Sequence, residues 1–201
     1  MKLKARQVAR RGYSQTTRAQ SAEDTGRRII DAFLERLMNQ WFDEITLDSV
    51  AGDADVTVQT VIRRFGGKDG LLAEAVTILA SQINAQRGKP SDNIDELIDR
   101  LYCDYERTGD SVVRLLALEP RHPAIQQVAA LGRREHREWV TRALAKPLSK
   151  LVPAARTGAI DALIVATDVY SWKLLRRDMS RSVPAAKAIT TSLVHGLIKQ
   201  F

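Results

Sequence analysis

The side chains with the clearest chemical potential lie in a short stretch, Thr57–Leu72, which reads TVQTVIRRFGGKDGLL. Arg63 and Arg64 are adjacent there, and Gln59 lies one helical turn before Arg63. A guanidinium can bind phosphate oxygens or pair with guanine through two hydrogen bonds, and a glutamine amide can pair with adenine in the same way. Paired arginines on a helix are more often an ordinary solvated surface, so the interpretation depends on the elements that position them.

Two short helices are predicted around this stretch, over residues 47–54 and 58–65, from the spacing of their apolar residues. A threonine precedes each helix, Thr46 the first and Thr57 the second, and its hydroxyl can accept a hydrogen bond from a backbone N–H in the first turn. Apolar pairs suited to a hydrophobic staple flank both caps: Ile45 with Val50, and Val56 with Val61. This layout is typical of a helix-turn-helix, whose second helix enters the major groove of DNA.

No enzyme site is evident in the sequence. His122, His136 and His195 are far apart and lack metal-ligand spacing, and there is no phosphate-binding loop or nucleophile elbow. Gly66-Gly67 follows no predicted strand, so we interpret it as a helix stop. The sequence therefore predicts a protein that is not an enzyme and has no catalytic residues, metal or cofactor.

The composition indicates a polyanionic partner. The chain has 201 residues, of which 44% are apolar, and a net charge of +7, which suits nucleic acid or an anionic membrane. No run of about 18 apolar residues is present, so no transmembrane helix is expected. The single cysteine, Cys103, excludes an internal disulfide and a cysteine-based zinc cluster, and it is expected in the core or a pocket wall. The cytoplasm is the expected compartment.

The first 22 residues form a basic arm. Its cations all precede the first acid, Glu23: Lys2, Lys4, Arg6, Arg10, Arg11 and Arg18. The arm lacks periodicity and is predicted to be disordered in isolation. A DNA-contacting arm, a solubilising tail, an organellar transit peptide and an anionic-membrane anchor all remain open for it.

The rest of the chain shows helical spacing and no strand pattern. Helices are predicted over residues 29–38, 47–54, 58–65, 71–83, 93–107, 112–118, 124–151, 155–178 and 184–199, about nine in all. Thr-Gly-Asp separates the fifth from the sixth, and Pro147 is expected to interrupt the seventh. We predict an all-α fold with a basic arm (1–22), a three-helix helix-turn-helix domain (23–67) and a helical effector-binding and dimerisation domain (68–201).

The stretch from Arg27 to Val76 resembles the tetracycline-repressor (TetR) family of transcriptional regulators. The residues that match the family pattern in register are Thr46, Val50, Ala51, Ala54, Val56, Thr57, Thr60, Phe65, Lys68 and Leu71. The resemblance implies a helical homodimer with a DNA-binding head and a variable body that holds an effector pocket. It implies phosphate contacts for Thr60 and Lys68, and base contacts for Val58, Gln59 and Arg63. The predicted DNA-binding set is Thr46, Thr57, Val58, Gln59, Thr60, Arg63, Arg64 and Lys68.

Three positions depart from the family pattern. Asp55 replaces the turn glycine, Ile62 a tyrosine that can hydrogen-bond a phosphate, and Arg64 a histidine. A phosphate contact from Arg64 would carry a permanent charge, so DNA binding is expected to depend more steeply on salt than in a typical relative.

The predicted helices of the body carry candidates for a pocket and for a dimer interface. The pocket candidates are Tyr102, Cys103, Tyr105, Leu116, His136, Trp139 and Tyr170, each of which taken singly is more often a core or surface residue. Two wide apolar faces near the end of the chain fit a dimer formed as a four-helix bundle, with burial inside the monomer as the alternative. The interface candidates are Leu163, Val169, Trp172, Leu193 and Leu197.

These observations lead to one function and one alternative. We expect a dimeric, sequence-specific regulator that binds a palindromic or pseudo-palindromic double-stranded DNA operator, does not enter a membrane, and represses transcription until a small-molecule effector of unknown identity releases it. The alternative is a dimeric nucleoid-type protein that binds DNA without sensing a ligand.

Overall fold

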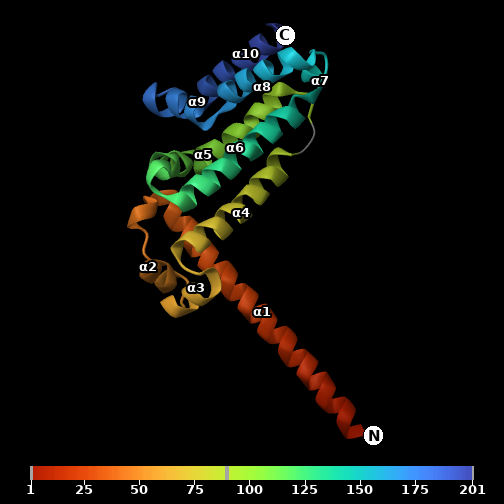
Figure 1. Ribbon diagram of the computed structural model, residues 1–201, viewed down its shortest axis with the longest axis vertical. Helices are drawn as coiled ribbons and strands as arrows, with labels where there is room; N and C mark the ends of the chain where they lie inside the picture. Colours follow the sequence, from red (N-terminus) through yellow and green to blue (C-terminus); the bar gives the residue numbers. More distant parts are fainter. Residues whose placement is uncertain (1, 89–90, 201) are drawn as a thin grey trace. The chain divides into compact units, whose positions relative to one another are not determined.

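The computed structural model describes the backbone of residues 2–88 and 91–200, and the side chains of residues 20–88 and 91–200 (Figure 1). Every regular element in this described part is a helix, with no strand in it, so the all-α fold class is confirmed. Packing divides the chain into two compact units, Met1–Ala75 and Val76–Phe201, which we call the head and the body.

The head contains α1 and the short helices on either side of the predicted turn. Its elements are α1 (Lys2–Asn39), η1 (Phe42–Glu44), α2 (Leu47–Asp53), α3 (Val58–Phe65) and the start of α4 (Lys68–Arg87). Its core is built from fully buried apolar side chains, among them Ile29, Phe33, Ile45, Val50, Val61 and Leu71. An ion pair of 2.5 Å between Arg36 and Asp53 joins α1 to the end of α2.

The start of the chain differs from the sequence prediction. Composition predicted a disordered arm over residues 1–22, whereas α1 begins at Lys2. The prediction concerned the arm in isolation, and a helix that extends from the packed segment after Glu23 needs no separate nucleation step. The side chains of residues 1–19, and with them most of the predicted basic arm, lie outside the described residues.

The boundary between the two units also differs in position. The sequence predicted it between Gly67 and Lys68, whereas the packing places it inside α4, between Ala75 and Val76. The reason is that Leu71, Leu72 and Ala75 are fully buried within the head unit. The first turns of α4 therefore belong to the core of the head.

The body is a set of packed helices. Its elements after α4 are α5 (Ile94–Leu118), η2 (Glu119–Arg121), α6 (Pro123–Ala143), α7 (Ala145–Leu148), α8 (Pro153–Thr167), α9 (Val169–Lys173), the π-helical turn η3 (Leu174–Asp178) and α10 (Val183–Gln200). Their common core includes Ile98, Leu101, Tyr102, Trp139, Leu163, Trp172 and Val194. The hydroxyls of Tyr102 and Thr190, 2.8 Å apart, join α5 to α10 inside this core.

The two helices predicted over residues 93–107 and 112–118 are in fact one, α5. The expected stop at Thr-Gly-Asp fails because Gly109 is buried in the middle of the helix. A Cβ atom on Gly109 would overlap the ring of Trp172, so the position needs a residue without a side chain. This glycine serves the packing of two helices and does not end one.

The long helices predicted later in the chain are interrupted. The helix predicted over 124–151 breaks at Leu144, three residues before Pro147, as expected from the clash of a proline ring with the preceding turn. The helix predicted over 155–178 breaks at Asp168, whose backbone is extended and whose carboxylate accepts a hydrogen bond of 2.8 Å from the Tyr170 N–H. Asp168 is thus a cap inside a continuous apolar pattern, which periodicity does not reveal.

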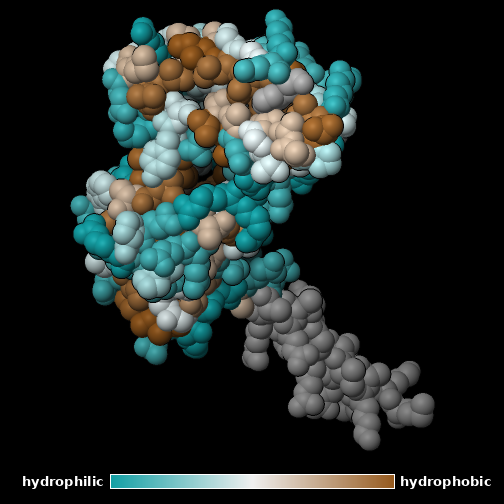
Figure 2. Space-filling view, turned by 45° about the horizontal axis from the view of Figure 1, so that its top comes forward, coloured by the Kyte–Doolittle hydropathy of each residue, from teal (hydrophilic) through white to brown (hydrophobic). Residues whose placement is uncertain are grey.

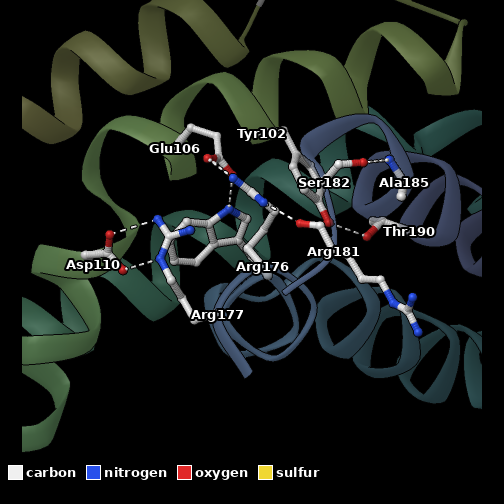
Figure 3. A network of polar contacts seen from close by, with 10 residues as sticks. Tyr102, Glu106, Asp110, Arg176, Arg177, Arg181, Ser182, Ala185 and Thr190 are labelled. Atoms are coloured by element: carbon white, nitrogen blue, oxygen red, sulfur yellow. Dashed lines mark hydrogen bonds and ion pairs between the residues drawn. The ribbon is translucent and has the colours of Figure 1, made fainter. Parts of the chain in front are cut away.

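A polar network fastens α9 and η3 to α5 (Figure 3). Arg176 donates to both carboxylate oxygens of Glu106, at 2.6 and 2.9 Å, and the Trp172 indole N–H donates to the same carboxylate at 2.8 Å. Arg177 makes a second two-bond pair with Asp110, both bonds being 2.8 Å long, and its guanidinium lies 4.5 Å from the centre of the Trp172 ring. Trp172 is therefore fixed by a hydrogen bond from its indole N–H to Glu106 and by the contact of its ring with Arg177.

Candidate functional site

Both helices of the helix-turn-helix begin at the predicted caps. The Thr46 hydroxyl accepts from the Ser49 N–H at 3.1 Å, and the Thr57 hydroxyl accepts from the Thr60 N–H at 3.2 Å. Each cap residue has an extended backbone, as an N-cap requires. The two caps set where α2 and α3 begin.

The turn and the stop depend on backbone conformations with positive φ. Asp55, which stands where the family pattern has glycine, adopts φ 51°, a conformation that aspartate tolerates better than most residues. Gly66 and Gly67 have φ values of 76° and 126°, and the Gly66 N–H donates to the Ile62 carbonyl at 2.8 Å. The double glycine is thus the C-terminal stop of α3, as the sequence predicted.

The outward face of α3 is polar and cationic. Gln59 and Arg63 are exposed and lie one turn apart, whereas Val61 is fully buried on the opposite side. The hydroxyls of Thr57 and Thr60 are 3.0 Å apart, so they share a hydrogen bond at the tip of the helix. This face presents hydrogen-bonding groups that a rigid, capped helix holds in a fixed direction.

Arg64 lies on one flank of α3 and turns towards α1. Its guanidinium occupies the space that a Cβ atom on Gly26 would need, and it lies 5.8 Å from the centre of the Phe65 ring. Ile62 lies on the other flank, because residues two apart on a helix are separated by about 200°, and 41% of its surface is exposed. The contribution of Gly26 was missed, since nothing in the local sequence indicates which side chain it faces.

The Lys68 side chain packs against η1. Its ammonium group is 4.2 Å from the centre of the Phe42 ring and donates to the Asp43 carbonyl at 3.4 Å. Burial lowers the pKa of Lys68. The predicted phosphate contact would therefore come from a lysine that is already oriented by η1.

Comparison with solved structures finds the same arrangement of helices elsewhere. A candidate transcriptional regulator from Pseudomonas aeruginosa PAO1 superposes with a TM-score of 0.67 at 17% identity, covering 87% of this chain and 90% of that one. A TetR-family transcriptional regulator from Streptomyces coelicolor superposes with a TM-score of 0.63 at 18% identity, covering 89% of this chain and 96% of that one. This chain has the TetR fold. No protein-family model and no curated protein sequence matches it.

In this TetR-fold chain, the body brings together only part of the predicted pocket set. Tyr105, His136 and Trp139 meet around the end of α4. Tyr102 is buried elsewhere, at its contact with Thr190, and Leu116 is half-buried beside the core. Cys103 and Tyr170 are exposed and lie outside this cluster, so the expectation that Cys103 lies in the core is wrong. Helical periodicity alone did not separate these faces.

A buried ion pair lies at the centre of this cluster. Arg87, at the end of α4, donates from Nε to Asp104 Oδ2 on α5 at 2.5 Å, and both side chains are at least nine-tenths buried. The guanidinium lies 5.0 Å from the centre of the Tyr105 ring and 5.8 Å from that of Trp139. Sequence analysis missed this pair, because an arginine and an aspartate on separate helices look like ordinary surface residues. We call Arg87, Asp104, Tyr105, His136, Trp139 and Thr167 the polar cluster.

His136 is the titratable group of the polar cluster. Its Nε2 lies 3.1 Å from Thr167 Oγ1, and its ring stacks on Trp139. Burial, together with the positive charge of Arg87, lowers the pKa of His136 from 6.5 to about 4. The imidazole is therefore neutral at physiological pH.

The stability of the body should depend on pH through His136. Between pH 6.5 and about 4 the unfolded chain binds a proton at this residue that the folded chain does not bind, so stability falls as the pH falls through this window. His136→Phe should remove that contribution. Urea unfolding of both proteins at several pH values measures it, with variant His195→Gln, at an exposed histidine, as the control. A constant difference in unfolding free energy between wild type and His136→Phe from pH 7 to pH 4 would contradict the assignment.

Some of the residues predicted for the dimer interface are buried in the body and others are exposed. Leu163, Val169 and Trp172 are buried inside the body, so they belong to its core and offer no surface to a second chain. Leu193 is 50% exposed and Leu197 is half-buried. Val165, Leu174 and Ile189 are exposed apolar residues of the same part of the body that lie outside the predicted interface set.

In residues 20–88 and 91–200, no group of three histidine, cysteine or acidic side chains could hold a metal ion. No helix in the described part of the chain is both long and apolar enough to cross a bilayer.

Proposed function

We propose that this protein is a sequence-specific DNA-binding transcriptional regulator that reads the major groove with α3. The observation that carries the proposal is the exposed pair Gln59 and Arg63 on a helix whose start is capped by Thr57 and whose end is stopped by Gly66. An amide and a guanidinium one turn apart match the hydrogen-bonding edges of adenine and guanine. The exposed Ile62 offers an apolar contact for a thymine methyl group.

The charge of the chain supports the same proposal. A net charge of +7 attracts the phosphate backbone, and Lys68 and Thr60 stand where the family pattern has phosphate contacts. Arg64, on the flank of α3 that faces α1, is the further candidate for a phosphate contact. Thr46, Thr57 and Val58 complete the proposed surface at the N-terminal ends of the two helices.

We propose a homodimer whose interface includes α10 and the exposed part of α8. A shallow groove on α10 is lined mostly by small and apolar residues, with one glutamine at its end: Ala188, Ile189, Ser192, Leu193, Gly196, Leu197 and Gln200. Small side chains allow a second helix to approach closely, and the exposed Val165 and Leu193 supply apolar area. Figure 2 shows that hydrophobic residues gather on part of the surface of the body. In a two-fold dimer, the two copies of α3 would lie about 34–36 Å apart to reach successive major grooves.

Repression relieved by an effector is the proposed mode of action. Bound at its operator, the dimer would exclude the polymerase, and an effector bound in the body would select a conformation with lower affinity for DNA. The polar cluster is the proposed place for the effector, because it gathers three of the predicted pocket residues around a buried charge pair.

Selection of genomic DNA fragments by the purified protein tests the proposal. We expect enrichment of a palindromic or pseudo-palindromic sequence, protected in footprinting over two half-sites one helical turn apart or a multiple of it. Sedimentation of the free protein should give the mass of a dimer. Enrichment of fragments without a common sequence would instead indicate a nucleoid-type protein, and the absence of DNA binding would overturn the proposal.

A further inference from the structure

The polar cluster contains three buried polar atoms without a hydrogen-bond partner: the ring nitrogens His136 Nδ1 and Trp139 Nε1, and the carboxylate oxygen Asp104 Oδ1. His136 Nδ1 and Trp139 Nε1 are both buried from solvent, and neither contacts a polar atom of the chain at hydrogen-bond distance. They lie one turn apart on α6, and their rings are stacked with centroids 5.5 Å apart. Since buried polar atoms nearly always have a partner, a group from outside the chain is expected to bind here.

The hydrogen-bonding roles of the two ring nitrogens can be assigned. The indole Nε1–H of Trp139 can only donate. The Thr167 hydroxyl has a single proton and donates it to the Leu163 carbonyl at 2.8 Å, so its oxygen accepts from His136 Nε2–H at 3.1 Å. Nδ1 of the neutral imidazole therefore carries no proton and is an acceptor. The two ring nitrogens thus present one donor and one acceptor, and Asp104 Oδ1 is a further acceptor.

The surrounding charges favour an uncharged ligand. The positive charge of Arg87 is balanced by Asp104 at 2.5 Å, and the second carboxylate oxygen of Asp104 lies 3.6 Å from Arg107. A charged ligand group would enter this buried region without a counter-ion of its own, which costs more than the binding of a neutral group. The aromatic rings of Tyr105 and Trp139 lie against the same guanidinium and make the surroundings of the pair largely apolar.

We propose that the polar cluster binds the effector through an uncharged group that both donates and accepts one hydrogen bond, a hydroxyl or a primary carboxamide on an aromatic or otherwise apolar molecule. The group accepts from Trp139 Nε1–H and donates to His136 Nδ1. That the ligand is an effector rests on the proposed function, whereas the binding chemistry rests only on contacts within the body.

The experiment is a titration followed by the indole N–H resonances in ¹⁵N-edited NMR of the full chain. The chain has three tryptophans, and the Trp139 signal is assigned by its loss in Trp139→Phe. Phenol and benzamide, the neutral probes, should shift the Trp139 signal at millimolar concentration, whereas benzoate and benzylamine should not. Trp172 is a matched internal control, because its indole N–H already donates to Glu106 at 2.8 Å and should not respond.

The variant His136→Phe keeps the stacked ring and the Trp139 reporter but removes the acceptor. It should lower the affinity for phenol and benzamide by about tenfold, the usual effect of losing one hydrogen bond. An unchanged Trp172 signal would show that the body remains folded. If neither neutral probe moves the Trp139 signal, the proposal is overturned in favour of a bound water. If the charged probes shift the signal equally, it is overturned in favour of a non-specific site.

The NMR titration requires no DNA, so it separates this inference from the proposed function. A Trp139 shift in a protein that binds no DNA would support the ligand site and overturn the regulator. DNA binding without a Trp139 shift would support a DNA-binding protein and overturn the ligand site.

Discussion

Replacing Gln59 and Arg63 together by alanine is expected to abolish sequence-specific DNA binding without unfolding the head. Both side chains are exposed, so their loss removes no core contact. Each good two-bond contact to a base is worth about 1–3 kcal/mol of discrimination, so the double variant should lose about 2–6 kcal/mol, or more than an order of magnitude in affinity. Fluorescence anisotropy with a selected fragment measures the loss, and circular dichroism checks the fold.

A matched control is available on the body. Gln127→Ala with Arg134→Ala removes the same two residue types and the same charge from exposed positions of α6. This control should keep the affinity of the wild type. Equal affinities in the wild type, the α3 variant and the control would show that α3 does not read DNA.

The salt dependence distinguishes the two possible roles of Arg63. If it contacts a phosphate, Arg63→Ala should reduce the slope of log K against log salt by about 0.9, with little change in sequence preference. As a base reader, which we expect from its outward position, it should instead relax the preference at one base pair. The same measurement on Arg64→His tests the predicted phosphate contact of Arg64, because a neutral histidine would lower the slope.

Arg87→Met is expected to destabilise the body by about 3–5 kcal/mol, because it leaves the Asp104 carboxylate buried without its partner. Asp104 Oδ2 loses a charged donor at 2.5 Å, and the nearest remaining cation, Arg107, lies 3.6 Å from the other oxygen and is half exposed. Contacts of the guanidinium with the Tyr105 and Trp139 rings are lost as well. Urea unfolding followed by tryptophan fluorescence measures the change.

The second change, Asp104→Leu, should restore stability in the Arg87→Met background. Replacing a buried ion pair by apolar residues of similar size is often neutral or stabilising, so most of the loss should be recovered. An exposed pair provides the control: Lys146→Met breaks a 3.0 Å ion pair with Asp92, whose partners are 74% and 80% exposed, and should cost less than about 1 kcal/mol. If Arg87→Met costs no more than Lys146→Met, the ion pair does not stabilise the body.

Several features could be predicted because the interacting atoms are close in the chain. Thr46 and Thr57 cap helices through backbone groups three residues ahead, and Gly66 stops α3 through a carbonyl four residues back. Pro184 lies in the first turn of α10, as its missing N–H predicts. These interactions require no knowledge of the rest of the fold.

Other features depend on residues that are far apart in the sequence. Gly109 looked like a helix stop until Trp172 was found packed against it, and Gly26 gave no local signal for its contact with Arg64. Arg87 and Asp104 are paired only because the fold of the body brings the end of α4 to α5. Residue type alone does not reveal a partner on another helix.

The sequence by itself determined the helical class, the two capped helices of the head and the exposed residues that we propose to read DNA. Only the tertiary structure decided which apolar residues are core and which are surface. Leu163 and Trp172 are buried while Val165 and Leu174 are exposed, although all four belong to one continuous apolar pattern. Helical periodicity shows that a helix has an apolar face, but the neighbouring helices decide how much of that face they cover.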